Sequence, residues 1–492
     1  MTSKFTRREF LRRSSALSIL GTGTPFALNL AALSSAAAAP ASDYRALVCL
    51  FLAGGSDTHN VVLATDTTSW NAYQTARNTG VDPIALLAAG TPANAGAAIN
   101  TPARLGGVLP ITPLTAQSGR SFALHPAMPW LTSQFAAGRA AVVSNVGPLI
   151  VPTTKAQYRA RSVPLPPKLF SHNDQQSLWQ SYSPEGARVG WGGRLGDLLV
   201  AAGNNSANPL FTAISTSGSA VWLSGQTVLQ YQVGSSGPTA IGGMTGTLFG
   251  SGTASGTFRS LITGTSGQLF ESEHAKVVSR SIDAQSRLAT TMLPAGTGGV
   301  PNPTQYTNPA TGTLATNGLA SQLQTVARMI GAQATLGVQR QVFFVQIGGF
   351  DTHDFQNREQ PRLLAQIDAA LQYFYGVLAS LGGRDYSGSV TTFTASDFGR
   401  TFTTNGDGTD HGWGSHQFVV GGGVKGGDLY GRFPITGLNH DDEVGSGSLL
   451  PVLSVDQYGA TLGKWFGASD TDLLTVFPSL GNFTQRNVGF MV

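Results

Sequence analysis

Three apolar segments of this chain each run into a short loop that holds an aspartate. They are LVCLFLAGGSD, QVFFVQIGGFD and VTTFTASD, and their aspartates are Asp57, Asp351 and Asp397. A continuous apolar run that ends in Gly-Gly, such as residues 47–52, is typical of a buried strand in a parallel sheet. The carboxyl ends of parallel neighbours meet at one edge of a sheet, where such folds carry their sites. We therefore expect the three aspartates to share an edge.

Helical patterns alternate with these strands. Residues 319–337 and 361–383 have helical periodicity, and a further helix is expected between Pro129 and Gly138. This alternation predicts an α/β fold with a doubly wound, mostly parallel sheet sandwiched by helices. From about residue 200 to 320 the composition shifts to Gly, Ser and Thr, which we interpret as a central insertion. Within it, residues 209–233 predict a pair of strands joined by a small-residue turn.

Residues 1–41 are interpreted as an export signal. Basic residues precede a weakly apolar stretch and an alanine-rich end with A-x-A-like cleavage sites. Arg7-Arg8, followed by Glu9-Phe10-Leu11, resembles the twin-arginine (Tat) pattern. This predicts the Tat export machinery as a partner and a periplasmic or secreted product. Residues 42–492 would then form the α/β domain, including its insertion.

The basic balance of the chain belongs largely to that signal. Five basic residues and one acidic residue give residues 1–40 a charge of +4, which is also the formal net charge of the whole chain. The rest is close to neutral, so its charge offers no case for nucleic acid or an anionic membrane surface. The single cysteine, Cys49, is expected to be a buried thiol in its apolar run. After residue 41 no apolar stretch reaches the roughly 20 residues that cross a bilayer.

Histidines and further acids accompany the three aspartates. His353 follows Asp351 by two residues, and the loop after Asp397 continues as TTNGDGTDHGWGSHQF. Carboxylates mixed with imidazoles suit zinc or manganese, or calcium or magnesium where carboxylates dominate. We predict a divalent metal ion held by residues of these loops: Asp57, Asp351, His353, Asp397, Asp410, His411 and His416.

Each of these residues also has a simpler interpretation. A single aspartate after a strand usually caps the next helix or forms an Asx-turn, and Asp354 is a candidate cap of this kind. The segment NGDGTDHG could be a polar surface turn, or a loose calcium loop without the spacing of an EF-hand. His59 and His440 could face solvent or bond to the backbone. Three apolar strands that end alike favour the shared metal site.

Several motifs resemble those of one known family. They occur in the same order as in that family and extend over nearly the whole chain after the signal. They are LAGGSDTHN, LHPAMPWL, SHNDQQSLWQ, IGGFDTHDFQ, SDFGRT and DHGWGSHQFVVGGGVKGG, and with the Tat-like start they are similar to the domain-of-unknown-function family 1501 (DUF1501). The core of that family is regarded as related to the alkaline phosphatase and sulfatase superfamily. The resemblance implies an alkaline-phosphatase-like core.

The superfamily pattern implies roles for the acids and histidines. Asp57 and Asp397 would share one metal. A second metal, or the leaving group, would be held by Asp351 and His353 with His411 or His416. The chain departs from the pattern at Phe398, where the superfamily often has a metal-binding histidine, and the spacing of Asp351 and His353 is narrower than usual.

The resemblance also implies catalytic residues. After a loop rich in proline and basic residues, LFSHNDQQSLWQS predicts a helix that Ser171 or Asn173 can cap. Ser171 falls at the place of the superfamily nucleophile, with His172 beside it as an acid or a ligand and Arg400 as a clamp for a non-bridging oxygen. Ser171 is not followed by the Pro-x-Arg of sulfatases that use formylglycine, so that chemistry is not expected. Its simpler role is a helix N-cap.

Two functions follow from this pattern. The first is an exported metal-dependent hydrolase of phosphate or sulfate esters, small or polymeric, attacked by Ser171 or by water. The second is a non-catalytic periplasmic binding or assembly protein whose metal site is structural. The departure at Phe398 favours the second.

Overall fold

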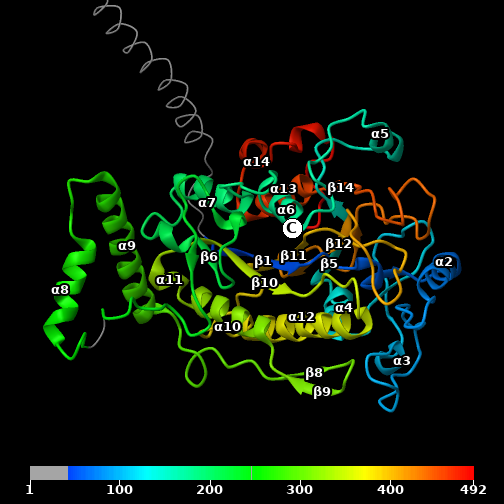
Figure 1. Cartoon of the computed structure of the whole chain (residues 1–492), viewed down its shortest axis with the longest axis horizontal. Helices are drawn as coiled ribbons and strands as arrows, with labels where there is room; N and C mark the ends of the chain where they lie inside the picture. The colour runs from blue at the N-terminus through cyan, green and yellow to red at the C-terminus, as the bar shows by residue number, and fades with distance from the viewer. Residues whose placement is uncertain (1–42, 245–246) are drawn as a thin grey trace, which may run out of the picture.

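The computed structural model describes residues 43–244 and 247–492, so the predicted export signal lies outside the described residues (Figure 1). Its centre is a nine-stranded sheet in which β12 runs antiparallel to both of its neighbours and the other pairs are parallel. This confirms the predicted α/β class with a mostly parallel sheet. The strands, in spatial order, are β13 (Leu429–Tyr430), β5 (Ala140–Gly147), β12 (Ser415–Gly421), β11 (Val390–Ser396), β1 (Arg45–Ala53), β10 (Arg340–Gly348), β6 (Ala213–Ser215) and β7 (Tyr231–Gln232), with β14 (Leu453–Ser454) beside β5.

Strand β1 is the middle of the sheet, as its apolar run predicts. Leu50 pairs with Val345 of β10 on one side and with Thr394 of β11 on the other. Successive side chains of a strand point to opposite faces. Val48 and Leu50 accordingly enter one hydrophobic layer, while Cys49 enters the other, where it is buried as predicted.

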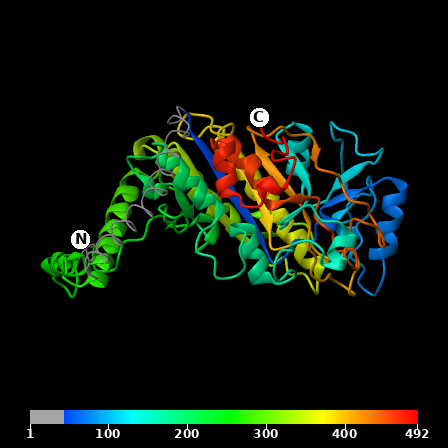
Figure 2. The same cartoon turned by 90° about the horizontal axis from the view of Figure 1, so that it is seen from above.

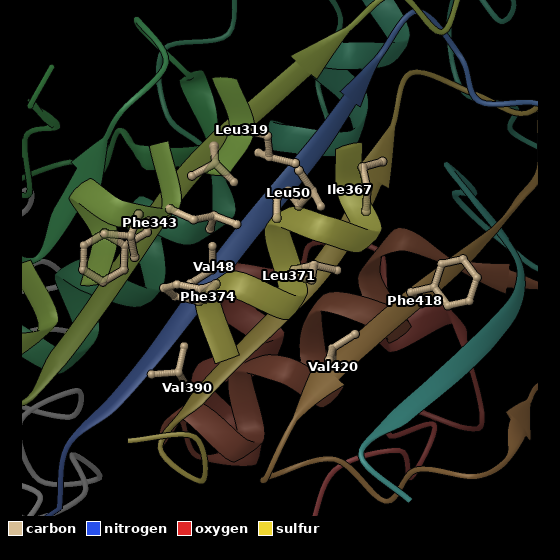
Figure 3. Packing of buried hydrophobic residues seen from close by; sticks show 14 of the residues in the cluster. Val48, Leu50, Leu319, Phe343, Ile367, Leu371, Phe374, Val390, Phe418 and Val420 are labelled. Atoms are coloured by element: carbon tan, nitrogen blue, oxygen red, sulfur yellow. The ribbon is translucent and has the colours of Figure 1, made fainter. Parts of the chain in front are cut away.

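Helices cover both faces of the sheet, and each face has its own apolar layer (Figure 1). In one layer, Leu371 and Phe374 pack against strand residues such as Val48 and Phe343 (Figure 3). The helices of this layer are α4 (Pro129–Ala136), α10 (Gly318–Gly331) and α12 (Gln356–Leu378). Those of the other layer are α6 (His172–Ser181), α7 (Trp191–Ala201), α13 (Val455–Phe466) and α14 (Asp470–Val476).

Shorter elements complete the part of the chain that the structure describes. They are η1 (Thr58–Asn60), β2 (Val62–Ala64), α2 (Thr67–Arg77), α3 (Pro102–Leu105), β3 (Leu109–Ile111), β4 (Phe122–Leu124), α5 (Lys155–Ala160), η2 (Pro209–Phe211), η3 (Val221–Leu223), β8 (Tyr306–Asn308), β9 (Thr313–Ala315), α11 (Gln333–Leu336) and η4 (Leu480–Asn482). Within residues 43–244 and 247–492, none of the helices is both long enough and apolar enough to cross a bilayer.

The Gly/Ser/Thr-rich segment has two parts. The first part contributes β6 and β7 to the central sheet, where they are parallel and separated in the chain by η3. The prediction for residues 209–233, two strands joined by a small-residue turn, was therefore wrong about the connection. A parallel pair needs a crossover, which a short turn cannot provide. The second part holds α8 (Gly252–Thr263) and α9 (Leu269–Thr291), which stand out from the body as a helical hairpin (Figure 2).

A buried carboxyl group on α13 should make stability depend on pH. Asp456 is buried and accepts one backbone hydrogen bond, from Ser479 N at 2.9 Å, and burial raises its pKa to about 7. The folded chain therefore holds this proton more tightly than the unfolded chain, whose aspartate has a pKa near 3.9. The contribution of protonated Asp456 to the free energy of unfolding is complete below about pH 4 and is lost as the pH rises towards 7.

Replacing Asp456 with asparagine should remove that loss. Urea unfolding at pH 4.5 and pH 8 should show a larger fall in unfolding free energy for the wild-type chain than for Asp456→Asn. The exposed Asp470, replaced in the same way, is the matched control and should leave the pH dependence unchanged. Equal pH dependence in wild type and Asp456→Asn would contradict the assignment.

Candidate metal centre

The loops after β1, β10 and β11 meet at the carboxyl edge of the sheet. Gly54, in the loop after β1, donates its N–H to Oδ1 of Asp397 at 3.1 Å. Its φ is +118°, and a Cβ there would lie 2.4 Å from the backbone nitrogen of Asp351. Only glycine fits so close to a neighbouring backbone with this φ. The Gly-Gly pair that ends the first strand therefore lets all three loops pack together.

His172, the first residue of α6, is oriented by Asp397. Its Nδ1 lies 2.8 Å from Oδ2 of Asp397, and Gln176, one helical turn later, donates to the same oxygen at 2.8 Å. The hydrogen bond to Asp397 raises the pKa of His172. Because a carboxylate only accepts hydrogen bonds, Nδ1 carries the proton and Nε2 of the neutral ring is unprotonated. Asp397 thus lies behind His172, fully buried, and not at the open face.

His411 is oriented in a similar way by a backbone carbonyl. It precedes β12, which is antiparallel to β11, so the start of β12 and the end of β11 lie at the same edge. Its Nδ1 lies 2.8 Å from the carbonyl oxygen of Phe170, to which it donates. Burial lowers the pKa of His411, so the neutral ring is favoured and its Nε2 is unprotonated.

The Nε2 atoms of the two histidines face the carboxylate of Asp351. Nε2 of His172 lies 3.4 Å from Oδ2, and Nε2 of His411 lies 3.4 Å from Oδ1. One ligand atom from each of these three residues lies within 4.8 Å of the other two. Either a proton on a ring nitrogen or a metal ion satisfies such facing atoms, and a histidine held by a carboxylate or carbonyl is the usual arrangement around a metal. His172, Asp351 and His411 could therefore hold a metal ion.

Asp351 is also bound from beneath by Arg400. Nη1 of Arg400 donates to Oδ1 at 2.9 Å; the arginine side chain is 0% exposed, whereas that of Asp351 is 44% exposed. Burial opposes ionisation of Asp351, but the guanidinium outweighs it and holds the pKa of Asp351 below its ordinary value. Arg400 therefore keeps this carboxylate ionised and in place. Its guanidinium is itself buried, and its predicted role as a clamp for a substrate oxygen stays a prediction.

His353 and Asp410 lie at the exposed side of the cluster. Nε2 of His353 is 2.9 Å from Nε2 of His411 and 3.2 Å from Oδ1 of Asp351. Its Nδ1 is 3.2 Å from Oδ1 of Asp410. His353 is thus positioned to be a further ligand or to exchange protons with solvent, with Asp410 orienting its ring.

Asp57 lies apart from this cluster, in a buried ion pair. Arg77, at the end of α2, binds both of its carboxylate oxygens, and Gln356 donates to Oδ2 at 2.6 Å. Both charged side chains are 0% exposed. Burial raises the pKa of Asp57, but the guanidinium more than offsets this and lowers it overall. An arginine thus supplies the positive charge that the sequence-based interpretation assigned to a metal.

His416 is also separate from the converging residues. Its Nδ1 accepts a hydrogen bond from Asn145 N at 3.1 Å, and its ring stacks on Phe433 with centroids 4.6 Å apart. Burial lowers the pKa of His416 to about 3, so it is neutral at any physiological pH. It functions as a packed, hydrogen-bonded core histidine.

Ser171 is the N-cap residue of α6, immediately before His172. Its Oγ donates to Oδ2 of Asp174 at 2.8 Å instead of accepting from the backbone N–H groups of the first turn. Phe170, on its other side, is the residue whose carbonyl holds His411. Ser171 is therefore next to the candidate metal centre in the chain, and its role as nucleophile stays a prediction.

Sequence reasoning missed three partners of these residues. Gln176 could have been found, because residues four apart share one face of a helix and His172 was already singled out. Arg77 and the carbonyl of Phe170 carry no sequence signal of their own, since each acts on a loop distant in the chain.

Phe398, at the predicted place of a metal-binding histidine, is buried and packs against the rings of His172 and His411, with centroids 4.8 and 4.6 Å apart.

Comparisons with known proteins add a family match over part of the chain. The model of a family described as "Protein of unknown function (DUF1501)" matches residues 266–453, which include Asp351, Asp397 and His411. No curated protein matches the chain. One solved structure, from a study of a Bacteroides thetaiotaomicron locus for metabolism of multiple glycosaminoglycans, is similar with a TM-score of 0.32 and 10% identity, covering 88% of this chain and 74% of that one. A TM-score this low establishes neither a shared fold nor a shared activity.

Proposed function

We propose that this chain is a divalent-metal-dependent hydrolase of phosphate or sulfate esters. The observation that carries the proposal is the convergence of His172, Asp351 and His411. Both imidazoles turn their Nε2 inwards, because Asp397 and the carbonyl of Phe170 hold Nδ1. Three protein ligands are typical of catalytic zinc sites, whereas structural zinc sites have four.

The donor set favours zinc or manganese. Two imidazole nitrogens and one carboxylate suit these ions, whereas calcium and magnesium prefer sites made of oxygen atoms. Such an ion supplies Lewis-acid polarisation of an ester oxygen when it is bound. Asp57 is not included in this proposal because Arg77 already binds both of its oxygens.

The exposed residues of the cluster are the proposed proton carriers. His353 lies at the open side, with Asp410 against its other nitrogen, so it can accept a proton from the attacking group or give one to the leaving oxygen. Ser171 is the proposed nucleophile, with Asp174 accepting its hydroxyl hydrogen bond, and attack by water is the alternative. Arg400 is proposed as a positioning residue that acts through Asp351.

We propose Tat export and a periplasmic or secreted location on the sequence of residues 1–41. The support is Arg7-Arg8 before a weakly apolar stretch and an alanine-rich end.

A second function is favoured by the arginines at these strand ends. Arg400 neutralises Asp351 and Arg77 neutralises Asp57, so neither acid needs a metal in order to be tolerated in the fold. This supports a non-catalytic binding or assembly protein whose metal, if bound, only stabilises the loops.

Hydrolysis assays on metal-loaded protein separate the two functions. Zinc- or manganese-loaded wild type is expected to hydrolyse a phosphomonoester, a phosphodiester or a sulfate ester, and Asp351→Asn should lower kcat/KM by about a hundredfold or more. Ser171→Ala should have a similar effect if its hydroxyl attacks, and a small one if water attacks. Asp283→Asn, a change at an exposed acid on the distant α9, is the control. Metal-loaded wild type that hydrolyses none of the three ester classes would favour the non-catalytic function.

A further inference from the structure

The segment between β5 and α6 is anchored beside the candidate metal centre. The carbonyl of Phe170 accepts from His411, and the ring of Tyr158 in α5 lies 5.6 Å from that of Trp413, two residues after His411. Leu165 and Leu169 pack in the same apolar cluster as Trp413. The segment thus forms one wall of the edge where the strand ends meet, and α5 stands out above it (Figure 1).

This wall is strongly and uniformly basic. Residues 148–173 contain Lys155, Arg159, Arg161 and Lys168 and no acidic residue, although only 11% of the residues of the chain are charged. Residues 41–492 carry no formal net charge, so the +4 of this segment is balanced by −4 elsewhere and the concentration of positive charge is local. Net charge alone, which gave no case for an anionic partner, does not reveal such a patch.

Two of the four cations are free of compensating acids. Lys155 is bound to Glu443 and is thereby neutralised. Arg159 and Arg161 are exposed and form no ion pair with any described residue. Lys168 is 67% exposed and forms an ion pair with Asp174 at 3.4 Å. We name Arg159, Arg161 and Lys168 the cationic rim.

A hollow beside the cationic rim differs from it, because the cations that line the hollow are paired with acids. It has a volume of about 650 Å³ and is lined by residues that include Lys155, Arg432 and Asp442. Arg432 binds both oxygens of Asp442, Lys155 binds Glu443 outside the lining, and Asp441 also lines the hollow, so the hollow has no excess of positive charge. The unpaired positive charges, those of Arg159 and Arg161, therefore belong to the rim and not to the hollow.

We propose that the cationic rim binds anionic groups of the substrate other than the one that reacts. The preferred substrate is then a chain on which sulfate or phosphate groups repeat, rather than a small molecule with a single ester. This inference rests on the proposed hydrolase function for its choice of substrate. Guanidinium and ammonium groups bind such oxyanions by charge-assisted hydrogen bonds. One oxyanion reaches the metal centre while its neighbours along the chain contact the rim.

Binding can be measured without metal, which separates the rim from catalysis. Dextran sulfate and inorganic polyphosphate are the two probes, uncharged dextran is the neutral control, and EDTA-treated full-length protein is titrated at about 50 and 200 mM salt. Wild type is expected to bind one or both anionic probes, and the stronger binding identifies sulfate or phosphate as the repeating group. Affinity should fall with salt, because binding of an anionic chain releases its counterions.

The rim variant is Arg159→Gln/Arg161→Gln/Lys168→Gln. It should bind about tenfold or more weakly than wild type at the lower salt concentration, and its affinity should depend less steeply on salt. The matched control removes the same number of exposed charges from the distant α8–α9 hairpin, as Arg259→Gln/Lys276→Gln/Arg280→Gln, and should bind like wild type. Thermal unfolding checks that both variants are folded.

The outcomes for the rim and for the hydrolase are distinguishable. If the rim and control variants bind the anionic probes with equal affinity, or if wild type binds neither probe, the proposal that the cationic rim binds repeating anionic groups is wrong. If binding depends on the rim but the metal-loaded protein hydrolyses no ester, the rim is a polyanion-binding site and the proposed hydrolase function is wrong. If both hold, kcat/KM for the polymer should fall about tenfold in the rim variant, with kcat/KM for a small monoester unchanged.

Discussion

Zinc or manganese titrated into wild-type protein should bind at about one ion per chain, and Asp351→Asn should weaken that binding by about a hundredfold or more. Asp351 supplies the carboxylate between His172 and His411. Asparagine keeps the size of the side chain but removes its charge, so the loss reports on ligation and not on packing. Isothermal titration of metal-free protein gives both the stoichiometry and the affinity.

Two further variants test whether the loss of metal affinity becomes smaller for residues farther from the metal. Asp397→Asn acts through His172 and should weaken binding by about 10- to 100-fold, the usual effect of a residue that orients a ligand. Asp410→Asn, at the exposed edge of the cluster, should have a smaller effect. Affinity should also fall as the pH is lowered, because His172, whose pKa Asp397 raises, then carries a proton on its ligand nitrogen. Unchanged affinity in Asp351→Asn would rule out this centre.

The buried pair of Arg77 and Asp57 should give the largest effect on stability. Arg77→Met leaves Asp57 charged and without its cation in the interior, which should cost about 3–5 kcal/mol of unfolding free energy. Arg77→Met/Asp57→Asn removes both charges and should recover part of that loss, so the two changes should not be additive. Urea unfolding measures all three proteins, with the midpoint expected to move more than the slope.

An exposed ion pair is the control for this effect. Lys464→Met breaks the bridge from α13 to Asp470, where both side chains are exposed, and should cost less than about 1 kcal/mol. Asp57→Asn, provided that it folds, should bind metal like wild type, because Asp57 lies outside the converging set. Loss of metal from folded Asp57→Asn, or an Arg77→Met loss no larger than that of Lys464→Met, would contradict this account of the pair.

Much of the central fold could be predicted because its signals are local. Apolar runs that end in Gly-Gly marked β1 and β10, a strand that ends in an aspartate loop marked β11, and their parallel pairing follows from the shared pattern of strand and loop. The pattern could not reveal that residues 209–233 pair in parallel, since a small-residue turn resembles a hairpin. The alternative of a cap at Asp354 does not hold, because α12 has Phe355 in the left-handed conformation as its N-cap residue.

The candidate metal centre was only partly predictable, for a different reason. Sequence identified the acids and histidines by residue type, but which of them face one another depends on contacts between distant segments. Asp57 and Arg77 lie in the same region of the chain, yet nothing local indicates that α2 turns this arginine inwards. His172 and Asp397 are 225 residues apart, and only the packed sheet shows that one orients the other.

The central position of β1 has a consequence for biosynthesis. Arg45 opens β1 and pairs with Arg340, so the strand that emerges first from the ribosome has its partner 295 residues later. At about 5–20 residues per second, it waits roughly 15–60 s before β10 is made, and longer for β11. Over that time an apolar segment with unpaired backbone groups is open to aggregation. The chain must therefore complete its sheet late in translation or after it, and we expect its yield to depend on chaperones that shield the first 50 or so residues of the domain.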